Sequence, residues 1–123
     1  MVDTDYNLAL SIQKAFAAAQ KVGGFNLLFS FDYGDNLLPR WTVPGDVTKL
    51  INQYKNHAAY FKHGTKPLVS TFEGHKRAAD WKTIRTATGC FFMPSYSSQG
   101  PAKALSYNVA DGLFSWAAVR EST

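Results

Sequence analysis

The sequence predicts an α/β fold in which strands and helices alternate along its 123 residues. Two observations predict this class. Four short apolar runs are separated by segments whose apolar residues recur at helical spacing. The composition, 46% apolar and 15% aromatic, is typical of a chain that packs a core and not of a disordered one. Strands that are separated by helices usually pair in parallel, through right-handed crossovers.

The first two elements are a helix and a strand. Apolar residues that include Ile12 and Phe16 predict a helix from about residue 5 to 22, and the Gly-Gly pair that follows ends it. The segment FNLLFSF, residues 25–31, is nearly continuous in apolar residues. Such a run predicts a strand that is covered on both faces. This strand is expected to end at Asp32.

The remaining elements continue the alternation. They are a helix over about 46–56, a strand over 68–72, a helix over 80–88, a strand over 90–94, a helix over 102–107 and a strand over 112–116. Asp80 is placed as the N-cap of its helix and Gly89 as its end. The residue pattern alone leaves two architectures open, an open doubly wound sheet and an arc of a (β/α)₈ barrel.

Charge and composition exclude several functions. The net charge of +4 is spread along the chain, whereas a nucleic-acid reader concentrates its basic residues, so we expect no nucleic-acid partner. No apolar run is long enough to span a membrane. The acidic N-terminus does not resemble a signal peptide. The single cysteine, Cys90, is expected to be a buried structural thiol, and the scattered histidines lack metal-site spacing.

Polar residues follow each expected strand at its carboxyl end. They are Asp32, Glu73, the segment 95–98 and Ser115 with Trp116. The carboxyl ends of parallel strands meet at one edge of the sheet, which is where α/β proteins bind ligands. The pattern therefore predicts a ligand site at this edge.

Three segments, NQYKNHAAYFKHGTKPLVSTFEG, TGCFFMPSYSSQGP and VADGLFSWAA, together resemble glycoside hydrolase family 71, the fungal α-1,3-glucanases or mutanases. The resemblance runs from about residue 6 to 118, and residues 119–123 read as an atypical tail. It implies a single partial catalytic domain over 1–123, folded as an arc of about four parallel strands of a (β/α)₈ TIM barrel.

The resemblance also implies the chemistry. Family members hydrolyse the α-1,3-glucan of fungal cell walls with inversion, and are typically secreted or bound to the cell wall. Inversion needs a carboxylic acid and a carboxylate placed about 6.5–9.5 Å apart. The resemblance puts that pair on a later strand, and the family usually carries Asp-Trp where this chain has Ser95 and Tyr96. It implies no cofactor and no specific protein partner, and the chain alone is expected to be inactive.

We therefore expect the edge residues to contact sugar. Asp32 and Glu73 are the candidates, either as acceptors for sugar hydroxyls, as ion-pair or loop anchors, or as direct proton-transfer groups. Tyr96 and Ser97 are expected to be further substrate contacts, and Trp116 is expected to stack on a sugar ring or to line the core. The alternative to a hydrolase is a non-enzymatic or vestigial glucan-binding protein.

Overall fold

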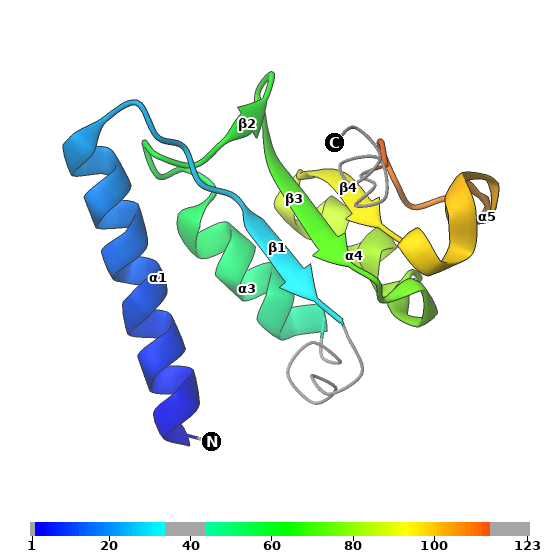
Figure 1. The fold of residues 1–123 in the computed structure, drawn as a ribbon, viewed down its shortest axis with the longest axis horizontal. Coiled ribbons are helices and arrows are strands. Elements are labelled where there is room, and N and C mark those ends of the chain that lie inside the picture. The colour runs from blue at the N-terminus through cyan, green and yellow to red at the C-terminus, as the bar shows by residue number, and fades with distance from the viewer. Residues whose placement is uncertain (1, 34–43, 114–123) are drawn as a thin grey trace, which may run out of the picture.

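The computed structural model describes residues 2–33 and 44–113, which form a small α/β domain. The elements in chain order are α1 (Val2–Val22), β1 (Phe29–Asp32), α3 (Pro44–Tyr54), β2 (Lys62–His63), β3 (Lys66–Phe72), the 3₁₀ helix η1 (His75–Arg77), α4 (Asp80–Thr88), β4 (Phe91–Ser95), the 3₁₀ helix η2 (Ser97–Gln99) and α5 (Gly100–Ser106). Figure 1 shows α3 and α4 behind the sheet, with α1 beside β1 and α5 beyond β4.

The sheet is mixed, which contradicts the expected arc of parallel TIM-barrel strands. β3 lies at its centre and pairs in parallel with β1 on one side and with β4 on the other. β2 pairs with the beginning of β3 in antiparallel orientation. β2 was not predicted, because residues 57–67 show only the turn-rich pattern of a connection between a helix and a strand.

A tight turn at Gly64 explains why β2 pairs with β3 in antiparallel orientation. His63 pairs with Lys66, so that only Gly64 and Thr65 separate β2 from β3. Gly64 has φ +65°, and Thr65 does not have a positive φ. A two-residue loop with a left-handed first residue is the type II′ turn of a tight β-hairpin, and glycine favours that position. The pairing extends by one bond, from Leu68 N–H to Phe61 O at 3.1 Å.

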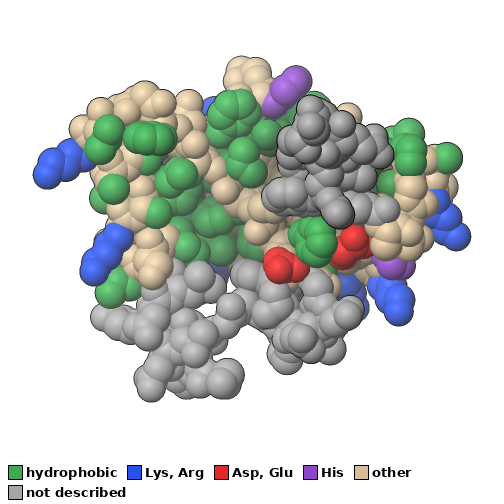
Figure 2. Space-filling model, in the orientation of Figure 1, with side chains coloured by type: hydrophobic (Ala, Val, Ile, Leu, Met, Phe, Trp, Pro, Cys, Tyr) green, Lys and Arg blue, Asp and Glu red, His purple; other side chains and the backbone are tan. Residues whose placement is uncertain are grey.

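Within the described residues, helices pack on one face of the sheet only, and along β1 this differs from the predicted cover on both faces. Burial alternates along β1: Phe31 is buried whereas Ser30 and Asp32 are exposed. α3 and α4 pack on the Phe31 face only, and Figure 2 views the opposite face, where polar and hydrophobic side chains are mixed. Leu28, which precedes β1, is 38% exposed.

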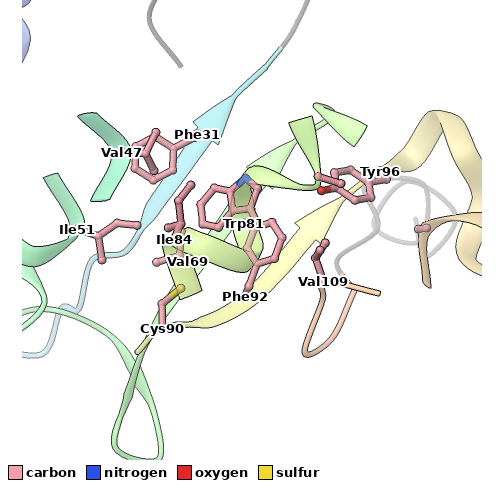
Figure 3. Packing of buried hydrophobic residues seen from close by; sticks show 12 residues of the cluster. Phe31, Val47, Ile51, Val69, Trp81, Ile84, Cys90, Phe92, Tyr96 and Val109 are labelled. Atoms are coloured by element: carbon pink, nitrogen blue, oxygen red, sulfur yellow. The ribbon is translucent and has the colours of Figure 1, made fainter. Parts of the chain in front are cut away.

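The core lies between the sheet and these two helices. Trp81 of α4 stacks on Phe92 of β4, with ring centroids 4.0 Å apart and planes 7° from parallel. Figure 3 shows this pair at the centre of the cluster. The other labelled members pack around it, namely Phe31, Val47, Ile51, Val69, Ile84, Cys90, Tyr96 and Val109. Burial of such large side chains provides most of the folding free energy.

A second cluster joins α1 to the sheet edge. Phe16 is 3% exposed and stacks on Tyr54 at 4.7 Å, while Tyr60 completes the cluster. The helix ends at Val22, where Gly23 N–H donates to Ala19 O at 3.0 Å. The Gly-Gly pair therefore ends this helix as predicted.

Of the two predictions for the ends of α4, one is confirmed and the other is wrong. Gly89 has a left-handed conformation and its N–H donates to Arg85 O at 2.8 Å, so that it ends the helix as predicted. The prediction for Asp80 was wrong: Asp80 is the first helical residue, preceded by Ala79 as N-cap, and it forms an ion pair with Arg77 at 2.8 Å. An acid in the first turn still favours the helix through its dipole.

The expected fourth strand, residues 112–116, is only partly described. Gly112 and Leu113 are described and do not form a strand, while residues 114–116, with Trp116, and the tail 119–123 lie outside the described residues. Asp111 and Gly112 instead donate their N–H groups to Phe92 O, at 2.8 and 3.3 Å. No helix within the described ranges is long and apolar enough to cross a membrane.

Candidate carbohydrate site at the carboxyl edge of the sheet

The three parallel strands end together in one row of residues. Asp32 of β1 is the register partner of Phe72 of β3, which is in turn the partner of Ser95 of β4. Asp32 and Phe72 are exposed, and Ser95 is fully buried. Register partners in a sheet point to the same face. The row therefore places a carboxylate next to an aromatic ring on the face opposite α3 and α4.

Glu73 follows this row immediately and has an unusual backbone. Its φ is +57°, and the next residue, Gly74, has φ +90°. A side chain in the left-handed region costs about 1–2 kcal/mol for a residue other than glycine. The Glu73 N–H donates to Ser95 O at 2.8 Å, which continues the β3–β4 pairing by one residue. Strain of this kind is most often found at functional sites.

The Glu73 carboxylate is held by the segment after β4. Ser98 Oγ donates to Glu73 Oε1 at 2.6 Å, and Ser98 N–H donates to Oε2 at 3.3 Å. Gln99 Nε2 donates to Ser98 Oγ at 3.3 Å. Both carboxylate oxygens thus accept hydrogen bonds from one serine, which fixes the position of Glu73 at the exposed edge. Figure 2 shows acidic side chains over the carboxyl ends of β1 and β3.

A layer of aromatic side chains supports the edge. Tyr96, directly after β4, is 3% exposed, and its ring lies 5.7 Å from Tyr107 and 6.4 Å from His75. Tyr107 Oη donates to Gln99 Oε1 at 3.0 Å. Burial raises the pKa of Tyr96, so that its hydroxyl stays protonated. This layer positions the segment that carries Ser98.

The structure places the predicted site residues in different surroundings. Asp32 and Glu73 come to the same edge, on adjacent strands, as expected. Tyr96 belongs to the buried layer beneath that edge. Ser97 begins η2, and Trp116 lies outside the described residues. The sequence analysis missed Phe72 and the pairing of Ser98 with Glu73, because no sequence signal separates Ser98 from the serines before it.

The described residues provide no metal centre. No group of three or more histidine, cysteine, aspartate or glutamate side chains in the ranges 2–33 and 44–113 is placed to hold an ion. Cys90 is buried, and burial raises the pKa of its thiol, which favours the unreactive protonated form. The chemistry available at the edge is hydrogen bonding by carboxylates and hydroxyls beside an exposed aromatic ring.

In α/β proteins, ligands commonly bind at the carboxyl ends of the strands, which is where this group of residues lies. Comparison with known families is more specific. The sequence profile described as "Glycosyl hydrolase family 71" matches residues 2–122, so the chain belongs to this family, which is one of glycoside hydrolases. No curated protein and no solved structure matched the chain.

Proposed function

We propose that this chain forms part of the sugar-binding face of a hydrolase that acts on α-1,3-glucan. Asp32 and Glu73 accept hydrogen bonds from sugar hydroxyls, and the acid and base of the reaction are not among the residues described above. Family membership supports a glycoside substrate. The observation that carries the role of Glu73 is its carboxylate, held at an exposed strand end by Ser98.

The hydrogen bonds of Glu73 favour binding over proton transfer. An inverting hydrolase needs a general acid that carries a proton and a base that activates water. Both oxygens of Glu73 accept hydrogen bonds from Ser98, an arrangement that suits an ionised acceptor. Carboxylate oxygens have several lone-pair sites, so Glu73 can bind Ser98 and a sugar hydroxyl together.

Co-sedimentation with insoluble α-1,3-glucan tests this proposal, with β-1,3-glucan as the control polymer. The chain is expected to bind the α-linked polymer and Glu73→Gln to bind it less well, while a reducing-sugar assay stays near background. Failure of the wild-type chain to bind α-1,3-glucan would refute the proposed substrate. Robust hydrolysis that Glu73→Gln abolishes would assign the chemistry to Glu73 instead.

The same hydrogen bonds favour a second candidate, a non-enzymatic glucan-binding protein. In this case Ser98 holds Glu73 as a permanent anchor of a binding surface that performs no chemistry. The two candidates differ in the activity of the protein as the cell makes it. Binding without hydrolysis by protein purified from its native source supports the second candidate, and hydrolysis there supports the first.

A further inference from the structure

Phe72 is an exposed aromatic residue in a row that otherwise ends in polar groups. It is 36% exposed, whereas Val69 and Thr71 of the same strand are 0% and 1% exposed. Its register partner is Asp32, and Glu73 follows it in the chain. Adjacent strands lie about 4.8 Å apart, so the side chains of Phe72 and Asp32 start side by side on the same face of the sheet. Phe72 therefore presents part of an apolar ring in a row that also carries a carboxylate.

We propose that Phe72 is a stacking platform for one glucose-type pyranose ring, with Asp32 and Glu73 accepting hydrogen bonds from hydroxyls at the rim of that ring. This inference rests on the proposed function and adds to it the residue that contacts the sugar face. Phe72 would then select for the shape of the sugar ring, and the two carboxylates would select for the positions of its hydroxyls.

The chemistry of a glucose ring matches this arrangement. In an α-1,3-linked residue the free hydroxyls are equatorial and point outward, the C1 oxygen is axial on one face, and axial C–H groups make the opposite face apolar. The face of an aromatic ring carries the negative part of its quadrupole, which attracts the positive hydrogens of C–H groups. Stacking therefore removes apolar surface of both partners from water. The hydroxyls at the rim keep their hydrogen bonds only if acceptors stand beside the platform.

Two other exposed phenylalanines lack these surroundings. Phe61 is 39% exposed and lies near the hairpin, where its backbone N–H donates to Leu27 O at 2.7 Å. Phe25 is 61% exposed and precedes β1. Both belong to the amino end of the sheet, away from Asp32 and Glu73. Phe61 is the better matched control for Phe72, because their exposures are nearly equal.

Titration calorimetry with a soluble α-1,3-linked glucose tetrasaccharide tests the platform. Phe72→Ala is expected to weaken binding about tenfold, since one face of a large apolar side chain loses its contact. Phe72→Tyr keeps the ring and is expected to bind within about twofold of wild type, as is Phe61→Ala. Wild-type affinity in Phe72→Ala would overturn the platform and leave the proposed function standing. Failure of the wild type to bind would overturn the proposed function.

A spectroscopic measurement does not depend on how the alanine variant folds. In protein labelled at phenylalanine, the signals of Phe72 are assigned as those that disappear in Phe72→Tyr. Stacking predicts nuclear Overhauser effects between these ring protons and C–H protons of the bound tetrasaccharide, and none from Phe61. Effects that arise from other phenylalanines, with none from Phe72, would place the sugar elsewhere and overturn the proposal.

Discussion

The ring of Tyr33 lies against the α-carbon of Gly74. A β-carbon at position 74 would stand 2.5 Å from Tyr33 Cγ and 2.7 Å from its Cβ, closer than atoms pack in proteins. The Tyr33 N–H also donates to Phe72 O at 2.9 Å. The residue after β1 therefore packs on the turn after β3 on both sides of Glu73. This contact fixes the backbone from which Glu73 reaches Ser98.

Gly74→Ala is expected to lower the free energy of unfolding by about 2–4 kcal/mol, because the new methyl group meets both the ring and a left-handed backbone. Urea unfolding at neutral pH measures the change. Gly89→Ala is the matched control. Gly89 has φ +69° and nothing within 4 Å of the added β-carbon, so it should lose only about 1 kcal/mol. Equal losses in the two variants would contradict the close contact with Tyr33.

Glu73 offers a test of backbone strain that is independent of its side chain. Glu73→Ala and Glu73→Gly both lose the hydrogen bonds to Ser98, but only alanine keeps a β-carbon in the left-handed region. The alanine variant is expected to be less stable than the glycine variant by about 1 kcal/mol. Chemical denaturation measures the difference. A more stable alanine variant would mean that residue 73 does not keep its left-handed conformation in solution.

The sequence predicted most helices and the position of the strands, because apolar spacing and glycines determine both. Apolar periodicity placed α1, α3 and α4, and Gly89 marked the end of α4. The parallel pairing of β1, β3 and β4 was expected, but the antiparallel β2 was not, since it depends on a single turn at Gly64. Within the described residues the sequence also overstated the burial of β1, because a run such as residues 25–31 does not show how many layers pack on it.

The candidate site was predictable in place but not in detail. Asp32 and Glu73 were found because residues at the carboxyl ends of parallel strands meet at one edge. The left-handed conformation of Glu73 was not predictable, since glutamate rarely adopts it. The role proposed for Phe72 rests on its register with Asp32, because an apolar residue at a strand end would otherwise be assigned to the core.

Tyr33 also makes stability depend on pH in the alkaline range. Burial raises its pKa from 10.0 to about 12, so the folded state holds the proton more tightly than the unfolded state does. The stability contribution is complete below pH 10 and is lost as pH rises through 12. Burial raises the pKa of Tyr60 and Tyr96 as well, which adds to the trend.

Tyr33→Phe separates this effect from packing, since it keeps the ring against Gly74 and removes the ionisable hydroxyl. Its stability is expected to fall less steeply than that of wild type between about pH 10 and about pH 12. Urea midpoints across this range measure the two slopes. Identical slopes would show that Tyr33 titrates equally in the folded and unfolded states, and would contradict its burial.

Asp111 links the segment after α5 to β4. Its Oδ2 accepts the Phe92 N–H at 2.9 Å, and its Oδ1 forms an ion pair with Arg85, whose Nη1 donates to Val109 O at 2.7 Å.

Asp111→Ala removes the acceptor of the Phe92 N–H and should cost about 2 kcal/mol, since an unpaired polar group keeps its full desolvation penalty. Asp111→Asn can keep one acceptor oxygen for the Phe92 N–H but loses the charge and the second acceptor that face Arg85, so it should cost about 1 kcal/mol. The difference in the free energy of unfolding between wild type and Asp111→Asn should become smaller in about 0.5 M salt, because the ion pair is partly exposed to solvent. Urea unfolding of the three proteins at low and high salt measures both effects. Equal losses in the alanine and asparagine variants would show that the charge of Asp111, and not its hydrogen bond to Phe92, holds this segment.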